Sequence, residues 1–429
     1  MYNTRCVGSR RRVEVIKSAV KLVLLSVLVT PGAIYAFKPG SRVLRMSQVV
    51  DKPAGTKSSG ARGEYESRPD AIPVEELKGM PFSRWRREQA KRYQDAQELE
   101  QLMGSLAEAV KAVAGFTRVI AVPDYREAFD ETRVYRDIGK GRRHNEIARR
   151  LLEVSMCSTG KLGLVAYPGK PPTVIDEGFG QFVATVNPLV GAGGLDAGVP
   201  TGTVIGVFDD ADEEGCILDY DIDEASRLEE LCLLKTLQPG RNLVGAAYAV
   251  YSASCELVLA VKGEGVHGFT LDPHIGEFIL TRPYMKIPKR GNTYSIDESR
   301  RDTWEDPVRE FVDKLRAGEG ESGEKYSYRL VGSAVADVHR VLMHGGIWGR
   351  PDTDAGEDQF GGDRTGGLAT LGEASPLAFI IEEAGGLAID GRGHRVLDTR
   401  PDTLRHKTGV FLGSRDDVEE LNRVCGTDK

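Results

Sequence analysis

Residues 187–198, with the sequence NPLVGAGGLDAG, have the composition of a loop that approaches a ligand closely. The apolar runs FVATV and TGTVIGVFD flank this segment, so we expect two strands joined by a tight glycine turn. Asp196 is the only carboxylate in the loop, which contains no base and no nucleophile. The segment therefore has the glycines of an active-site loop but few groups that could perform chemistry.

Other short motifs point to no alternative chemistry. The glycine-rich GAGGLDAG lacks the Lys-Ser/Thr pair of a phosphate-binding loop and the spacing of a dinucleotide fingerprint. The seven histidines show no zinc-ligand spacing, and no serine or cysteine lies in a nucleophile elbow. His339, in ADVHR, is expected to be a packed residue of a helix.

The periodicity of apolar residues predicts helices that alternate with strands, and thus an α/β or α+β protein whose sheets are covered by helices. Segment 313–329, DKLRAGEGESGEKYSYR, is interpreted as a surface loop. Helices are expected over 98–121, 141–156, 335–346 and 376–384, and strands over 161–169, 181–191, 201–209, 246–261, 265–271 and 276–281.

The composition is that of a globular protein. The chain has 429 residues, 40% of them hydrophobic, and can bury a large core. Its net charge is −7 and its pI is about 5.7, and no basic patch stands out in the body of the chain, which argues against a nucleic-acid partner.

The first 67 residues have the pattern of a two-part leader. Residues 1–36 combine basic residues, the short apolar run LVLLSVLV and a small residue at Ala36, which is typical of a signal peptide. Residues 37–67 are basic and hydroxylated, like a transit peptide. We expect import into a plastid stroma, with simple secretion as the alternative, and no membrane segment in the mature protein.

Three longer stretches are distinctive, namely GRNLVGAAYAVYSASCELVLAV, GEFILTRPYMKIPKRGNTYSIDE and SPLAFIIEEAGG. They resemble one family, the class I fructose-1,6-bisphosphatases, and specifically their redox-regulated plastid type. The resemblance implies a layered sandwich of two α/β halves, here 68–275 and 276–429, usually assembled as a homotetramer. It also implies Mg²⁺-dependent hydrolysis of fructose 1,6-bisphosphate to fructose 6-phosphate in carbohydrate metabolism.

The residues implied as metal ligands are mostly missing. The family's loop reads Asp-Pro-Leu-Asp-Gly-Ser-Ser-Asn-Ile-Asp, and its two leading aspartates correspond to Asn187 and Val190. The loop's last aspartate, Asp196, and the later Glu373 remain, and Leu189 keeps its place as a weak or lost metal position. Upstream, the family's glutamates correspond to Tyr167, Pro168 and Gly169. Mg²⁺ requires anionic oxygen ligands, so its binding here is doubtful.

The positions implied to hold the sugar phosphate are also changed. The family's asparagine and three tyrosines correspond to Asp297, Arg300, Leu330 and Arg350, and its lysine and arginine correspond to Gly367 and Ala369. Arg300 and Arg350 could form a different anion site, because arginine binds phosphate with two hydrogen bonds. They could equally be solvated surface charges. Arg329 keeps the arginine that in the family reaches a neighbouring subunit's substrate.

The acidic segment 209–232 contains eleven Asp and Glu residues and two cysteines, Cys216 and Cys232. The resemblance implies a disulfide between them that thioredoxin reduces, in an exposed loop. Two independent thiols are the alternative. Cys157 and Cys255 lie in apolar segments and are expected to be buried.

These observations predict a plastid protein of the fructose-1,6-bisphosphatase type that is catalytically impaired. It would act as a pseudoenzyme or regulatory subunit, in a homo-oligomer or in a hetero-oligomer with an active sibling. An active Mg²⁺-dependent phosphatase with a rebuilt site and a sugar-phosphate sensor are the alternatives.

Overall fold

The computed structural model of the protein describes residues 74–91, 96–120, 140–175, 181–209, 232–352 and 366–426. They belong to one compact unit, Pro69–Lys429. The leader expected over residues 1–67 and Cys216 of the acidic loop lie outside the described residues, so those expectations stay predictions.

An eight-stranded sheet with the order β2-β1-β3-β4-β5-β6-β7-β8 dominates the first half of the described chain. Among the described strands of this sheet, only β1 and β3 pair in parallel. Its central strands are nearly continuous runs of buried residues, because both faces of the sheet are covered. The strands are β1 (Leu162–Ala166), β2 (Thr173–Val174), β3 (Phe182–Val190), β4 (Thr201–Asp209), β5 (Leu243–Tyr251), β6 (Cys255–Val261), β7 (Gly265–Asp272) and β8 (Glu277–Arg282).

The helices of the N-terminal region cover one face of this sheet. Their apolar side chains form one core with those of β1 and of β3 to β8. In α5, Leu102, Leu106, Val110 and Val113 recur at helical spacing and are buried. The helices are α3 (Val74–Leu77), α4 (Phe82–Ala90), α5 (Ala96–Val119) and α7 (Lys140–Cys157).

Two helices, α10 (Ala334–His344) and α11 (Ser375–Glu383), cover the other face. Their side chains share a core with residues of both sheets, for example Val204 of β4 and Leu412 of the second sheet. Burial of α11 is nearly complete from Ser375 to Ile381. The two helices therefore form a layer between the sheets.

The second sheet has five strands in the order β10-β9-β11-β15-β13, and a two-stranded sheet, β12-β14, lies apart from it. The outer face of the five-stranded sheet packs against α9 (Asp306–Ala317) and α12 (Arg415–Gly426). The strands are β9 (Thr293–Ile296), β10 (Ser327–Tyr328), β11 (Ile347–Arg350), β12 (Leu368–Ala369), β13 (Leu387–Ile389), β14 (Lys407–Thr408) and β15 (Val410–Gly413). Short turns of helix are η1 (Ala192–Ala197), η2 (Gly240–Asn242), η3 (Glu298–Thr303), η4 (Thr370–Ala374) and η5 (Val396–Asp398).

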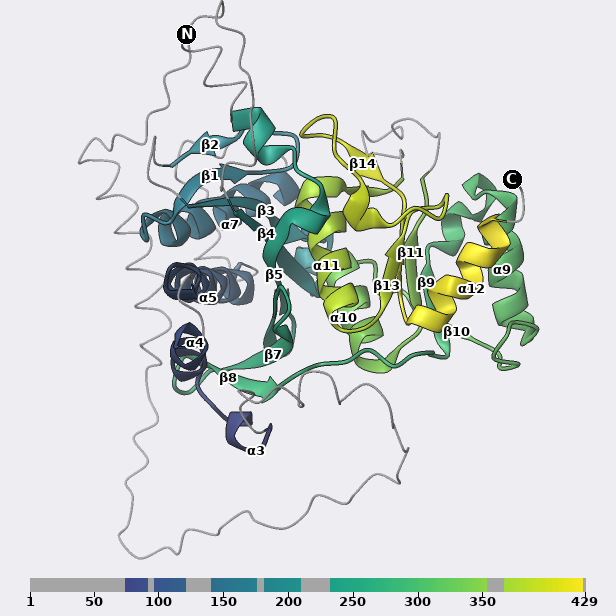
Figure 1. The fold of residues 1–429 in the computed structure, drawn as a ribbon, viewed down its shortest axis with the longest axis horizontal. Helices are drawn as coiled ribbons and strands as arrows, with labels where there is room; N and C mark the ends of the chain where they lie inside the picture. The colour runs from purple at the N-terminus through teal and green to yellow at the C-terminus, as the bar shows by residue number, and fades with distance from the viewer. Residues whose placement is uncertain are drawn as a thin grey trace, which may run out of the picture. The chain divides into compact units, whose positions relative to one another are not determined.

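The three cores stack helices and sheets alternately, as helix, sheet, helix, sheet, helix (Figure 1). This arrangement confirms the expected layered α/β sandwich. The predicted division between residues 275 and 276 falls between β7 and β8, which both belong to the large sheet, and the division into two domains stays a prediction.

The expectation of a surface loop over 313–329 is wrong for its first part. Residues 313–317 complete helix α9, in which Val308, Phe311, Val312 and Leu315 form a buried stripe at helical spacing. The charged residues between them face solvent, and they hid the apolar periodicity of this segment in the sequence. Tyr326 is also buried, and its backbone N–H donates to the Leu315 carbonyl over 2.9 Å.

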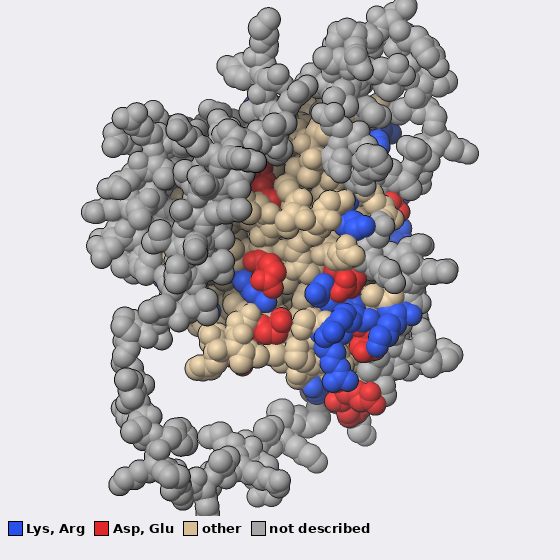
Figure 2. Space-filling model, turned by 90° about the vertical axis from the view of Figure 1, so that its left-hand side faces the viewer, with Lys and Arg blue, Asp and Glu red and all other residues tan. Residues whose placement is uncertain are grey.

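Figure 2 shows the side of the molecule on which α4, α5 and α7 lie, where the described basic and acidic side chains are neighbours. Ion pairs on these helices include Arg86 with Glu100 at 2.7 Å and Lys111 with Glu108 at 2.8 Å. Both pairs are partly buried, since the side chains of Arg86, Glu100 and Lys111 are 28%, 15% and 17% exposed. In the described part of the chain, none of the helices has the length and apolarity needed to cross a membrane.

Candidate ligand-binding site

The glycine-rich loop is a turn between β3 and β4, as the sequence predicts. Its short helix η1 lies between two left-handed glycines, Gly191 with φ of 79° and Gly198 with φ of 73°. Asp196 lies on this turn, is exposed, and makes no hydrogen bond or ion pair with the described residues. The structure thus places this remnant carboxylate on the surface.

The end of β3 turns its apolar side chains into the protein. Leu189 packs in the core on one face of the large sheet, and Val190 packs in the core on the other. The register of β3 on β4 shifts between Asn187 and Val190, where the Pro188 carbonyl accepts a hydrogen bond from Thr203 Oγ1 at 2.7 Å. Neither Leu189 nor Val190 offers a side-chain oxygen to a metal.

Asn187 instead contacts the other remnant carboxylate. Its Nδ2 donates to Oε1 of Glu373 over 2.8 Å. Glu373 lies on η4, a π-helical turn that runs directly into α11. Burial raises the pKa of the Glu373 carboxyl, whereas the Arg350 guanidinium and the Asn187 amide act to lower it. An amide that donates to a carboxylate requires no cation between them, whereas two carboxylates would.

Residues 167–169, upstream of β3, place apolar groups against the turn that carries Glu373. A Cβ atom placed on Gly372 would lie 2.5 Å from Cγ of Pro168, so the proline packs directly on the turn that carries Glu373. Tyr167 is buried, and the Arg149 guanidinium lies 5.4 Å from the centre of its ring. Gly169 has a φ of 70°, which disfavours any glutamate at that position.

A cavity of about 310 Å³ opens beside Asn187 and Pro168. Among the described residues that line it, Glu146 is the one carboxylate, and it was not identified from the sequence. Burial opposes its ionisation, but hydrogen bonds from Arg149 and Lys170 hold its pKa at about 2. The Lys170 ammonium lies 3.0 Å from Glu146 Oε2. Glu146 is therefore neutralised by cations of the protein. The residues lining the cavity are Asn145, Glu146, Arg149, Tyr167, Pro168, Lys170, Asn187 and Pro188.

These residues do not fit a magnesium site. Within the described parts of the chain, no group of three or more His, Cys, Asp or Glu residues could hold a metal ion. The nearby polar groups are an amide, a carboxylate bound to that amide, and a second carboxylate bound to lysine and arginine.

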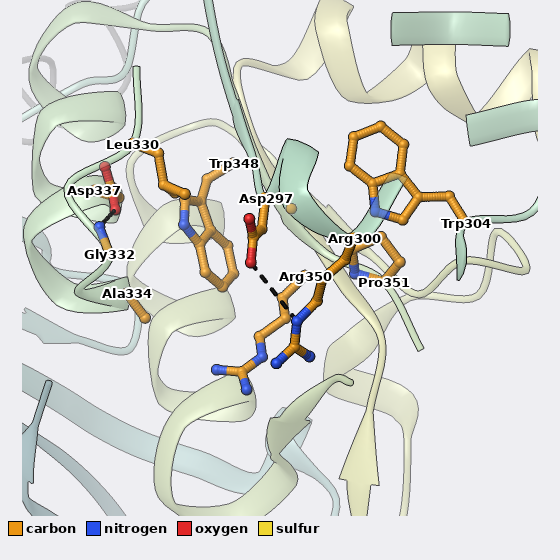
Figure 3. A pocket seen from close by; sticks show the side chains of 11 residues that line it. Asp297, Arg300, Trp304, Leu330, Gly332, Ala334, Asp337, Trp348, Arg350 and Pro351 are labelled. Carbon is orange, nitrogen blue, oxygen red and sulfur yellow. Dashed lines mark hydrogen bonds and ion pairs between the residues drawn. The ribbon is translucent and has the colours of Figure 1, made fainter. Parts of the chain in front are cut away.

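A second cavity, of about 250 Å³, brings together the positions predicted to bind the sugar phosphate, namely Asp297, Arg300, Leu330 and Arg350. Figure 3 shows the guanidinium groups of Arg300 and Arg350 side by side, extending in the same direction. Arg300 Nε lies 3.7 Å from Asp297 Oδ2. The two arginines, which the sequence could not distinguish from solvated surface charges, line one cavity. Its other lining residues are Trp304, Gly332, Ala334, Asp337, Trp348, Gly349 and Pro351.

Backbone capping fixes the walls of this second cavity. Asp297 caps η3 by accepting hydrogen bonds from the backbone N–H of Ser299 at 3.1 Å and from its hydroxyl at 2.7 Å. On the opposite wall, the buried Asp337 accepts from Val331 N at 2.9 Å and from Gly332 N at 3.1 Å. Arg340 also binds Asp337, at 3.1 Å. The Asp337 carboxylate is thus already neutralised.

Arg329 lies outside this cavity. Its side chain is exposed, and Nη1 donates to the Tyr328 carbonyl at 2.7 Å. The side chains around it are unusually apolar for a surface, since Tyr328, Leu330 and Val331 are 39%, 37% and 43% exposed. An arginine placed in this way cannot serve the cavity of its own chain without moving.

Cys232 differs from the exposed loop residue that was expected. It is buried, at the start of a helical segment over 232–236, and its carbonyl accepts from Thr236 Oγ1 at 2.7 Å. Apolar neighbours of the sheet core cover it, which the acidic sequence upstream did not indicate. Burial of Cys255 is as predicted and raises the pKa of its thiol to about 12, while Cys157 is only partly buried.

Comparison with known proteins identifies the class to which this fold belongs. Residues 151–283 match the model of the fructose-1-6-bisphosphatase N-terminal domain, and residues 287–426 match that of the C-terminal domain. The chain therefore belongs to the fructose-1,6-bisphosphatase family.

Two individual relatives and one solved structure support this family assignment. The chain is 35% identical over 329 residues to the chloroplastic fructose-1,6-bisphosphatase of Brassica napus, which covers 76% of this chain and 77% of the relative. It is 39% identical over 271 residues to that of Spinacia oleracea, with 62% of each chain covered. The crystal structure of Leishmania major fructose-1,6-bisphosphatase in apo form superimposes with a TM-score of 0.65 at 27% identity, covering 81% of this chain and 99% of that chain.

Proposed function

We propose that this protein is a fructose-1,6-bisphosphatase-family member of plastid carbohydrate metabolism that has lost most or all of its phosphatase activity. The observation that carries the proposal is the hydrogen bond from Asn187 to Glu373, which satisfies without a cation the carboxylate that remains. Val190 in the core and Pro168 against Gly372 support it, because neither position can supply a ligand.

The chemistry of phosphoryl transfer makes these changes severe. In such reactions the protein does little covalent work, and metal ions neutralise the developing charge and orient the attacking water. Without a set of anionic oxygen ligands, the remaining groups have little means of stabilising the transition state. The proposed role is therefore that of a regulatory or helper subunit for an active sibling, in a hetero-oligomer.

A sugar-phosphate sensor is the second candidate. It is favoured by the cavity in which Arg300 and Arg350 converge, since that cavity requires no metal to attract an anion. The two candidates are separated by whether the protein co-purifies with an active plastid fructose-1,6-bisphosphatase.

Phosphate release from fructose 1,6-bisphosphate by the purified protein tests the loss of activity. We expect no release in Mg²⁺ beyond that in a chelator, and no difference between the wild type and Glu373→Gln. Turnover in Mg²⁺ comparable to that of the Brassica napus relative, and abolished by Glu373→Gln, would show an active enzyme with a rebuilt site.

Location in a plastid is supported by the leader pattern of residues 1–67 and by the chloroplastic relatives. Sequencing the N-terminus of protein from isolated plastids should find a start well beyond Ala36. Secretion into the medium would contradict the proposal.

Redox control by thioredoxin rests on the acidic segment that precedes Cys232. The burial of Cys232 implies that a bridge to Cys216 would be less accessible than one in an exposed loop. Mass spectrometry of unreduced peptides should find the linked pair, whereas two alkylated thiols in oxidising buffer would contradict it.

A further inference from the structure

The C-terminal helix α12 buries two carboxylates that lie one turn apart. The side chains of Asp417 and Glu420 are 0% and 6% exposed. They share one cation, because Nη1 of Arg290 lies 3.3 Å from Oδ1 of Asp417 and 2.5 Å from Oε2 of Glu420. A buried charge is costly unless it is paired, and here one guanidinium faces two acids.

A third carboxylate and a second guanidinium complete the group. Glu321, in the turn after α9, has Oε2 at 3.1 Å from Nη2 of Arg290 and Oε1 at 2.6 Å from Nη2 of Arg423. We call these three acids and two arginines the α12 network: Asp417, Glu420, Glu321, Arg290 and Arg423. With all its carboxylates ionised the network has one negative charge in excess, so one bound proton would make it neutral.

The other charged groups around the α12 network are paired with one another or face solvent. Glu310 and Lys314 of α9 form an ion pair of 2.6 Å. On the outer side of α12, Arg415 lies 3.7 Å from Glu419. The strands β13 and β15 contribute apolar side chains beneath the helix. Asp416 is partly exposed, and the remaining charged neighbours are exposed, namely Lys289, Glu319, Glu324 and Lys325.

The α12 network holds the segment 318–326, which connects α9 to β10. Asp417 accepts a hydrogen bond from the Tyr326 hydroxyl at 2.7 Å, and Glu420 accepts one from the backbone N–H of Glu321 at 2.9 Å. Apart from Tyr326, no residue of this segment is buried. The edge strand β10 adds only two residue pairs with β9. A segment with so little burial depends on these bonds to remain docked.

The protonation of Asp417 is linked to this docking. Burial raises the pKa of Asp417 to about 6, and the charge of Glu420 acts in the same direction. Hydrogen bonds from Tyr326 and Gly291 and the charge of Arg290 act to lower it. In an opened segment, the solvated carboxyl would have a pKa of ~3.9. The docked form therefore binds the proton more tightly, so docking is favoured below pH ~6 and is weakened as the pH rises through that value.

We propose that the α12 network is a proton-controlled latch, which holds segment 318–326 and β10 more firmly when Asp417 carries a proton from solvent. Protonation leaves two carboxylates for the two guanidinium groups of the network. Because β10 leads directly into Arg329 and the exposed side chains of Leu330 and Val331, the latch governs how rigidly that surface is presented. The inference goes beyond the proposed function and does not depend on whether the protein is active.

Hydrogen–deuterium exchange of the full chain over a pH series from 5 to 8 tests the latch. Protection factors, which are corrected for the intrinsic exchange rate, should be about 10-fold higher at pH 5 than at pH 8 in peptides that cover residues 318–328. Asp417→Asn cannot bind the proton and should remove this difference. Tyr326→Phe keeps the carboxylate but removes a hydrogen bond to its ionised form, so the midpoint of the transition should move to higher pH.

Glu419→Gln is the matched control, because it removes a carboxylate from the exposed side of the same helix. It should retain both the 10-fold difference and the midpoint. An equal pH dependence in the wild type and in a folded Asp417→Asn would overturn the proposal, as would higher protection at pH 8 than at pH 5. Where thermal unfolding shows that Asp417→Asn is not folded, an unchanged midpoint in Tyr326→Phe would overturn it. Phosphate release tests the proposed function separately, so either can fail alone.

Discussion

The side-chain amide of Asn187 and the carboxylate of Glu373 form a 2.8 Å hydrogen bond, although 186 positions separate them in the sequence. The bond joins the end of β3 to the π-helical turn that begins α11, so it connects the large sheet to the middle helical layer. The carboxylate of Glu373 thus has an amide donor from the protein itself as its partner.

Asn187→Asp should therefore not restore a metal site. It would set a second carboxylate against Glu373, and we expect the free energy of unfolding to fall by about 1–3 kcal/mol near neutral pH, because a donor is lost and two like charges meet. Urea unfolding and Mg²⁺ titration measure the two effects. The double variant Asn187→Asp with Glu373→Gln reverses the pair and should regain most of the stability. Tight, saturable Mg²⁺ binding by the single variant would contradict the expectation.

The packing of Pro168 against η4 gives a second prediction. In Gly372→Ala, the new methyl group would meet Pro168 Cγ at 2.5 Å, so the free energy of unfolding should fall by about 1–3 kcal/mol. Gly193→Ala is a matched control, since a Cβ there has no atom within 4 Å. Thermal unfolding of both variants would decide it, and equal stability would show that Pro168 does not pack tightly against Gly372.

The fold was largely predictable from the sequence, because its strands are long apolar runs bounded by glycine and its helices have regular apolar spacing. The runs 181–191 and 201–209, for instance, correspond closely to β3 and β4. The resemblance to the family also implied which carboxylates would be absent. Asp297, Arg300, Leu330 and Arg350 could be expected to converge only through that resemblance, since they come from three separate segments.

What replaced the missing groups could not be predicted. The bond of Asn187 to Glu373 depends on a contact between segments distant in the sequence. The ion pair of Glu146 with Lys170 could not be predicted either, because it joins two segments that are separate in the sequence. The spacing of Glu146 to Arg149 and Arg150 on one helix was the signal available in the sequence.

His339 provides a prediction on pH dependence. It lies on α10 with Nδ1 2.9 Å from the Tyr248 hydroxyl, packed as the sequence suggested. Burial lowers its pKa to about 4, with Arg282 and His344 acting in the same direction and Glu256 opposing them. The unfolded chain, with a histidine pKa of ~6.5, takes up a proton first as the pH falls. The stabilisation of the folded state by neutral His339 is therefore complete above pH ~6.5, and it is lost as the pH falls from ~6.5 to ~4.

When the pH falls from 7 to 5, His339 should lower the free energy of unfolding of the wild type by about 2 kcal/mol. His339→Gln should remove that part of the pH dependence. Tyr248→Phe, which keeps the imidazole buried, should retain it. Urea unfolding at the two pH values measures the difference, and identical slopes for wild type and His339→Gln would refute the assignment.

Arg329 carries the prediction that tests the helper role. It is exposed, it lies outside the cavity of its own chain, and it is flanked by the exposed apolar residues Tyr328, Leu330 and Val331. A surface of this kind suits contact with another subunit, and the family resemblance implies that this arginine reaches a neighbour's substrate. An inactive chain could then complete the site of an active partner.

In a mixed oligomer with an active plastid sibling, Arg329→Ala should raise the sibling's KM about 10- to 100-fold, because a charge-assisted contact to phosphate is lost. Lys325→Ala, an exposed cation four positions earlier, should leave the KM unchanged. Co-expression, purification through a tag on this chain and steady-state kinetics provide the measurement. Absence of a mixed oligomer, or equal KM values for the two variants, would exclude the helper subunit and favour the sensor.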